Sequence, residues 1–157
     1  MAFSDAAILL ERAKARGVMF ACSESCTGGM VAAALTDLPG SSGMFDRGFV
    51  TYTNAAKIDL LGVSPATLDQ FGAVSQEVAR EMAQGALARS MAQIAVSITG
   101  IAGPGGSEHK PEGRVCFGLA SRNILQAETC DFGALGRDRV RLAARDHALS
   151  LLLQAVS

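Results

Sequence analysis

The chain has 157 residues, of which 49% are hydrophobic and 18% are charged, and its formal net charge is −1. This length and composition suit one folded domain and exclude an intrinsically disordered chain. The charge lacks the basic excess typical of proteins that follow a nucleic-acid backbone, so we expect no nucleic-acid partner.

The N-terminal residues and the cysteines predict a cytoplasmic protein without a metal cluster. Residues 1–17 lack the basic start and the cleavage site of a signal peptide, and no apolar run is long enough to span a membrane. The cysteines lack the spacing of a zinc site, so we expect free thiols in a reducing compartment. They are Cys22, Cys26, Cys116 and Cys130.

Hydrophobic periodicity and turn residues predict strands that alternate with helices through residue 98, followed by two adjacent strands. That order predicts an α/β fold, a three-layer α/β/α sandwich with a mixed, mostly parallel sheet of five or six strands, in a single domain over residues 1–157. In chain order we expect a helix over 4–16, a strand over 18–23, a helix over 28–37, a strand over 47–53, a short helix over 54–62, a helix from 75 to about 90, a strand over 93–98, strands over 114–121 and 125–132, and a helix over 137–155.

The last of these helices has an amphipathic pattern. We expect its leucines to face inward and its arginines to face solvent. The leucines are Leu142, Leu149, Leu152 and Leu153, and the arginines are Arg137, Arg139, Arg141 and Arg145.

Three loops carry small, polar or glycine residues that a core does not need: residues 23–29, 51–57 and 99–106. Each follows or ends a predicted strand. Ligand sites in open α/β sheets gather beyond the carboxyl ends of strands, so we expect these loops to form the site.

Ser25 in the first loop is the candidate nucleophile. We expect it just before a helix that begins near Thr27, whose free N–H groups could stabilise an oxyanion or bind a phosphate. Gly28 and Gly29 would let a ligand approach closely. The alternative is that Ser25 or Thr27 only caps the helix.

A base for Ser25 is found more readily among the lysines than among the histidines. His147 is expected to be a half-exposed helix residue, and His109 lies in a polar loop. Lys57 follows the second predicted strand at a loop edge, where desolvation would favour its neutral form. The alternative is a solvated helix residue. Tyr52, the only tyrosine, could bridge or polarise the pair.

The third loop, residues 99–106, lacks the Gly-Lys-Ser/Thr ending of a Walker A motif, so the sequence does not support nucleoside triphosphate hydrolysis. Its backbone N–H groups could still hold a phosphate or a ribose. Taken alone, it is equally typical of a surface loop.

Taken together, these motifs resemble the CinA C-terminal family, whose enzymatic members are nicotinamide mononucleotide amidohydrolases. The resemblance spans nearly the whole chain in the order of the family. The matching stretches are ESCTGG (24–29), LPGSSGMFDRGFVTYTNAAKIDLLGV (38–63), GAVSQEVAREMAQGA (72–86), VSITGIAGPGG (96–106), KPEGRV (110–115) and FGALGRDRVR (132–141).

The resemblance implies a serine–lysine hydrolase that uses neither metal nor cofactor and releases ammonia and nicotinate mononucleotide. It assigns Ser25 as nucleophile and Lys57 as general base, with Tyr52 beside them. It also implies a homodimer or a higher homo-oligomer, with Arg47 as a candidate for phosphate or dimer contacts. The residues expected to hold the nucleotide are Thr27, Gly28, Gly29, Thr99, Gly100, Ala102 and Gly103.

Two positions depart from the pattern of many relatives: Glu112 and Arg114 stand where a small hydrophobic residue and a threonine are common. We expect Arg114 to alter how its loop meets the substrate. Longer family members carry an N-terminal domain, whose activity we do not expect here.

Three alternatives stay open at this point. The chain could be an amidase of another small carboxamide, or a nucleotide-binding or assembly module without catalysis. The nucleophile could also be Cys26, which is adjacent to Ser25. A domain without catalysis would not need Ser25, Tyr52 and Lys57 together.

Overall fold

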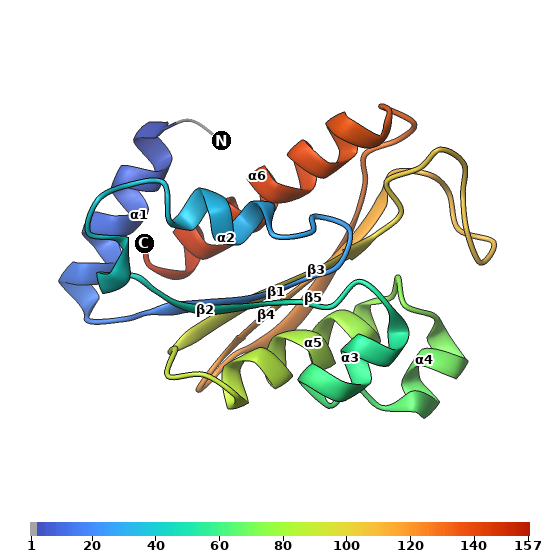
Figure 1. The fold of residues 1–157 in the computed structure, drawn as a ribbon, viewed down its shortest axis with the longest axis horizontal. Helices are drawn as coiled ribbons and strands as arrows, with labels where there is room; N and C mark the ends of the chain where they lie inside the picture. Colours follow the sequence, from blue (N-terminus) through green and yellow to red (C-terminus); the bar gives the residue numbers. More distant parts are fainter. Residues whose placement is uncertain (1–2) are drawn as a thin grey trace.

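The computed structural model describes residues 3–157, which form a five-stranded sheet between two layers of helices (Figure 1). Helices α1, α2 and α6 cover one face of the sheet, and α3, α4 and α5 cover the other. The helices are α1 (Phe3–Arg16), α2 (Met30–Leu35), α3 (Asn54–Leu61), α4 (Pro65–Phe71), α5 (Gln76–Ala88) and α6 (Arg137–Ala155), and the strands are β1 (Phe20–Glu24), β2 (Phe45–Val50), β3 (Ile94–Gly100), β4 (Arg114–Ser121) and β5 (Leu125–Asp131).

The sheet has the strand order β2-β1-β3-β4-β5. Strand β1 pairs in parallel with both β2 and β3, whereas β4 pairs antiparallel with β3 and β5. Four strands therefore point the same way and only β4 is reversed. The predicted three-layer fold with a mixed sheet of five or six strands is confirmed.

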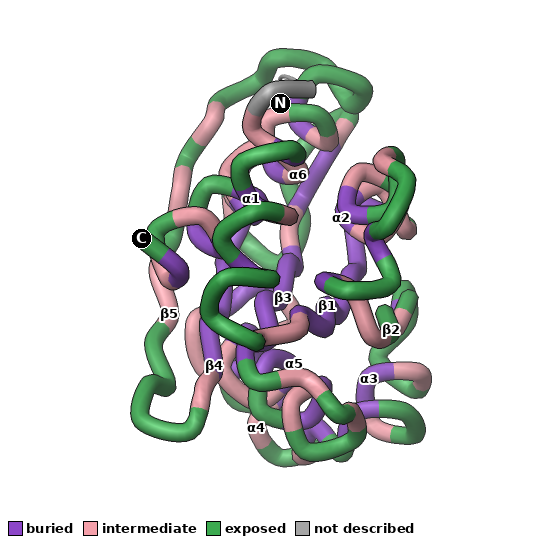
Figure 2. Tube along the Cα trace, turned by 90° about the vertical axis from the view of Figure 1, so that its left-hand side faces the viewer, coloured by how far each residue is buried: buried purple, intermediate pink, exposed green. Residues whose placement is uncertain are grey.

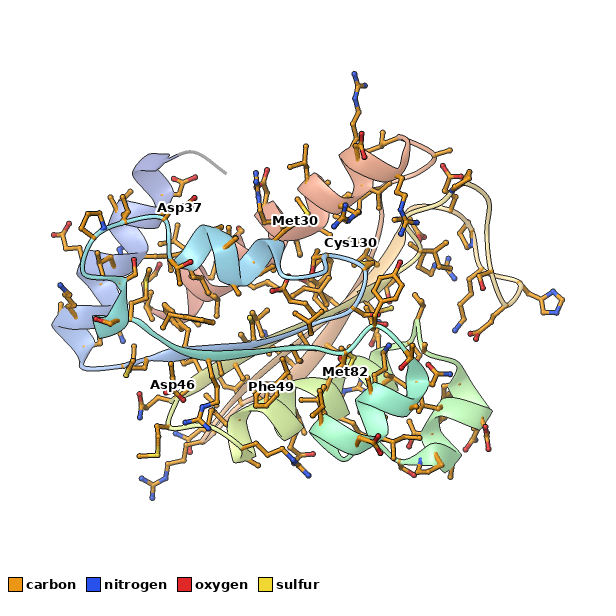
Figure 3. All side chains as sticks on the ribbon, viewed as in Figure 1. Met30, Asp37, Asp46, Phe49, Met82 and Cys130 are labelled. Carbon is orange, nitrogen blue, oxygen red and sulfur yellow. The ribbon has the colours of Figure 1, made fainter. Side chains whose placement is uncertain are left out.

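Burial follows the position of each strand in the sheet. The central strands β1, β3 and β4 are buried almost throughout, whereas the edge strands β2 and β5 are partly exposed (Figure 2). Phe49 of β2 and Met82 of α5 lie in the second apolar layer, between the sheet and α3, α4 and α5 (Figure 3). Because both faces of the sheet are covered, polar groups reach solvent mainly at the strand ends.

Two predicted helices differ from the structure. The helix expected over 28–37 begins only at Met30, because Gly28 and Gly29 have φ values of +56° and +109° in the turn before it. In α6, Leu149 and Leu152 are buried as predicted, but Leu142 is 41% exposed. The buried face of α6 runs instead through Val140, Ala144 and Ala148, and Leu142 lies about 200° around the helix from Val140.

The remaining helix predictions agree with the structure within a few residues. Ser75 caps α5 as expected, since its side-chain oxygen accepts a hydrogen bond from Val78 N at 3.2 Å. Within residues 3–157, no helix is both long enough and apolar enough to cross a bilayer.

Candidate active site

A cavity of about 370 Å³ opens at the carboxyl ends of β1 and β3. Its wall is made by the turn after β1, the segment between β2 and α3, α3 itself, the segment before α5, the glycine-rich loop after β3 and the first residue of α6. Its volume lies within the range of small-molecule sites. The three loops that the sequence singled out therefore meet at one edge of the sheet.

Ser25 and Lys57 are in direct contact at this cavity. Lys57 Nζ lies 3.1 Å from Ser25 Oγ, and their exposed fractions are 1% and 8%. The same Nζ donates to the backbone oxygens of Thr51 at 3.0 Å and Tyr52 at 3.4 Å. The sequence had suggested that Lys57 lies at a loop edge. In the structure it is a buried residue of α3.

Burial lowers the pKa of Lys57 from its ordinary value, because desolvation disfavours the ammonium. A negative charge on Cys26 would act in the opposite direction and is the smaller effect. The neutral amine that this shift favours can accept a proton from Ser25. The pair therefore has the distance and the electrostatics of a nucleophile and its base.

The N-terminus of α2 is occupied by the carboxylate of Glu24. This fully buried side chain accepts hydrogen bonds from the N–H groups of Gly29 at 3.2 Å, Val31 at 2.9 Å and Ala32 at 3.0 Å. The expectation that these donors face an oxyanion or a phosphate is therefore wrong, because a carboxylate of the chain itself already satisfies them.

The turn between Ser25 and α2 is also held from the side of α6. Arg141 donates from Nε to the carbonyl oxygen of Cys26 at 3.0 Å, so this arginine faces inward, contrary to the prediction. A Cβ on Gly28 would lie 3.3 Å from the Arg141 guanidinium, at a φ that side chains rarely adopt. Thr27, Gly28 and Gly29 shape this turn and do not line the cavity.

The glycine-rich loop contributes Thr99, Gly100, Ala102 and Gly103 to the cavity wall. Thr99 Oγ1 donates to the carbonyl oxygen of Ala73 at 2.8 Å, which ties the end of β3 to the segment before α5. All four residues predicted in this loop therefore lie beside Ser25 and Lys57.

Tyr52 and Arg137 form the rim of the cavity. The Tyr52 side chain is 57% exposed, and its hydroxyl accepts a hydrogen bond from Arg137 Nη2 at 2.7 Å rather than contacting Ser25. Arg137 Nη1 also donates to the carbonyl oxygen of Gly103 at 2.7 Å. The tyrosine reaches the lysine only through its backbone oxygen.

Arg137 is a site residue that the sequence analysis assigned only to an outward helix face. Part of the signal was present in the sequence, because the strand predicted over 125–132 comes directly before this helix. The structure adds that β5 points the same way as β1 and β3, so α6 starts at the end of the sheet where the site lies.

Arg47 is placed away from this cavity. It lies on the edge strand β2, pairs with Asp46 at 2.9 Å and donates to the carbonyl oxygen of Arg89 at 3.2 Å. It does not line the cavity, so the structure does not bring it to the other predicted site residues.

Cys26 lines the cavity but is a poor nucleophile. Burial, the largest effect, raises the pKa of its thiol to about 12. Since the thiolate is the reactive form, almost none is present near neutral pH. The chemistry of the two neighbours therefore favours Ser25.

Of the two positions that depart from the family pattern, Glu112 supports the glycine-rich loop and Arg114 links two strands of the sheet. Glu112 accepts a hydrogen bond from Gly105 N, and Arg114 pairs with Asp131 at 2.8 Å across β4 and β5. Neither side chain lines the cavity, so the expected effect of Arg114 on substrate contact finds no support in the geometry.

The sequence profile of the CinA C-terminal domain matches residues 3–156. The chain belongs to this family. It is 53% identical over 144 residues to the nicotinamide-nucleotide amidohydrolase PncC of Enterobacter agglomerans, covering 90% of this chain and 87% of that protein. It is 52% identical over 145 residues to the protein of the same name from Escherichia coli K12, covering 90% and 86%.

Other members of the CinA C-terminal domain family are longer. A putative competence-damage inducible protein of Caldicellulosiruptor saccharolyticus is 47% identical over 150 residues, which cover 95% of this chain but only 36% of that protein. Among solved structures, the competence/damage inducible protein of Agrobacterium tumefaciens superposes with a TM-score of 0.92 at 48% identity, covering 98% of this chain and 93% of that one. A CinA superfamily protein of Escherichia coli gives 0.93 at 35%, covering 99% and 93%.

Replacing Glu24 with glutamine tests its part in holding the turn of Ser25. Glu24→Gln puts an amide NH₂ where one carboxylate oxygen accepts from the backbone, so we expect the free energy of unfolding to fall by about 2 kcal/mol. Urea unfolding would measure this, with Glu11→Gln on the exposed face of α1 as the control. Equal stability of the two variants would contradict the role.

Proposed function

We propose that this chain is a nicotinamide-nucleotide amidohydrolase that releases ammonia and nicotinate mononucleotide through Ser25 and Lys57. The observation that carries the proposal is the 3.1 Å contact between Lys57 Nζ and Ser25 Oγ in a buried pair open to a cavity. The substrate is supported by the names of the PncC relatives, which the chain matches over most of their length. A homo-oligomeric state stays a prediction from the family.

In the proposed mechanism, Ser25 Oγ attacks the carboxamide carbon as its proton passes to Lys57 Nζ. The lysine, now an ammonium, returns that proton to the leaving nitrogen, and ammonia departs from the acyl-enzyme. A water molecule then attacks the ester carbon and gives a proton to Lys57. Lys57 passes that proton to Ser25 Oγ as the C–O bond to the serine breaks, which regenerates the serine hydroxyl and the neutral lysine. The carboxylic acid product loses its remaining proton to solvent.

The developing oxyanion needs donors other than the N-terminus of α2. In this turn, the N–H groups of Ser25, Gly28 and Gly29 are bonded to Ile98 O, Ser25 O and Glu24. Of the turn residues that line the cavity, this leaves the N–H group of Cys26 as our candidate donor. Cys26 directly follows the nucleophile in sequence, as a residue that supplies an oxyanion donor often does.

Arg137 is our candidate for binding the phosphate of the nucleotide. It is the first residue of α6, it lines the cavity, and its guanidinium is oriented by Tyr52 and by Gly103 O. A planar guanidinium binds phosphate oxygens through paired hydrogen bonds. The arrangement gives Tyr52 a positioning role at the rim in place of the expected role beside the serine.

Ser25→Ala should abolish ammonia release from nicotinamide mononucleotide in the presence of EDTA, because it removes the nucleophile. The matched control is Cys26→Ala, which we expect to keep turnover within about threefold, since its thiol is protonated. An active Ser25→Ala protein, or an inactive but folded Cys26→Ala protein, would overturn the assignment. No release by the unaltered chain would point to another carboxamide or to a binding module.

Lys57→Met should abolish turnover while the chain stays folded, because methionine fills the buried volume that alanine would leave as a cavity. In the unaltered chain, kcat/KM should rise as pH increases through the lowered pKa of Lys57 and level off below 10.5, since only the neutral amine accepts the proton. A pH–rate profile with circular dichroism checks both. A folded, active Lys57→Met variant would exclude the dyad.

Arg137→Gln should raise KM for nicotinamide mononucleotide about tenfold or more, because a charge-assisted contact with phosphate is lost. The change in kcat should be smaller. Arg139→Gln, on an exposed residue of the same helix turn, is the control and should leave both constants unchanged. Equal KM values in the two variants would place the phosphate elsewhere.

A further inference from the structure

Three side chains with metal-binding atoms converge between β5 and α6, apart from the cavity of Ser25. Glu128 and Cys130 lie two residues apart on β5 and so face the same side of the sheet, toward His147 of α6. Cys130 is labelled in Figure 3, on the face of the sheet that α6 covers. None of the three lines the active-site cavity.

Both residues of β5 approach the same nitrogen. His147 Nε2 lies 2.6 Å from Glu128 Oε1 and 3.5 Å from Cys130 Sγ, and the three ligand atoms all lie within 4.8 Å of one another. The ring of His147 packs on Phe117, with centroids 4.5 Å apart, which holds Nε2 toward the strand. The convergence is therefore built by the packing of a helix on a sheet.

One of these distances matches a tetrahedral zinc site, and a second comes within reach of it after a small movement. With Zn–N near 2.0 Å and Zn–S near 2.3 Å, the nitrogen and sulfur ligands of one ion are about 3.5 Å apart. The Cys130–His147 separation already has this value. Glu128 would have to withdraw by about 0.7 Å to coordinate in the same geometry, and its side chain is 46% exposed and free to do so.

The cluster is accessible to an ion from solvent, because the side chains of His147 and Glu128 are 30% and 46% exposed. A second cavity of about 250 Å³ is lined by Glu128 and Phe117. It opens beside Glu128 only, since neither Cys130 nor His147 lines it. A solvent water molecule would supply the fourth ligand.

We propose that Glu128, Cys130 and His147 form a zinc-binding site that joins the edge strand β5 to the middle of α6. The bound ion replaces the proton of the Cys130 thiol and any proton on His147 Nε2, and both protons pass to solvent. The site is structural and independent of the amide chemistry, because its ligands lie outside the catalytic cavity. Its failure and the failure of the proposed function are therefore separate results.

The test is metal binding by the full chain without an affinity tag, after removal of metals with a chelator. Co²⁺ is titrated first, because a thiolate ligand produces a charge-transfer absorption in the near ultraviolet. Zn²⁺ affinity is then measured by competition with a chromogenic chelator. We expect one ion per chain, and a melting temperature raised by about 5 to 10 °C when zinc is at roughly a hundred times its dissociation constant.

His147→Gln and Cys130→Ser should each weaken zinc binding at least about tenfold, and Cys130→Ser should also abolish the thiolate–cobalt band. The matched controls are His109→Gln, at the only other histidine, and Cys116→Ala, on β4; both should bind as the unaltered chain does. Fewer than one ion per chain would overturn the site. So would equal affinity in His147→Gln, or a loss of binding in His109→Gln.

Discussion

The contact between Lys57 and Ser25 is the constraint on which the rest of the site depends. Lys57 is 1% exposed, and its three acceptors are a hydroxyl and two backbone oxygens rather than a carboxylate. Neutral acceptors compensate only part of the lost hydration of an ammonium, so the pKa of the lysine falls. Burial without an ion pair is thus what makes this lysine a base, and a carboxylate beside it would remove the property.

That contact requires the turn that carries Ser25 to be held in place. Glu24 accepts hydrogen bonds from N–H groups at the start of α2. Arg141 donates a hydrogen bond to the carbonyl oxygen of Cys26. The glycines of the turn serve its left-handed backbone. Electrostatic groups that never reach the cavity therefore determine where the nucleophile points.

The directions of the strands decide which segments meet. Because β1, β3 and β5 point the same way, the serine turn, the glycine-rich loop and the start of α6 lie at the same end of the strands. The reversal of β4 lets β5 follow it through a short connection and become an outermost strand of the sheet, on the side opposite β2. There, β5 faces the middle of α6, which brings Glu128, Cys130 and His147 together outside the cavity of Ser25.

The sequence by itself determined the elements, the layer order and the loops that form the site, because hydrophobic period, turn residues and the motif around Ser25 are local signals. Family motifs added the pairing of Ser25 with Lys57. Only the tertiary structure decided that Glu24 occupies the helix N-terminus, that Arg137 reaches the cavity and that Leu142 faces solvent. Such outcomes depend on which polar group occupies a hydrogen-bond donor in the folded chain and on how a helix is rotated against the sheet. Both are set by contacts between residues far apart in the sequence.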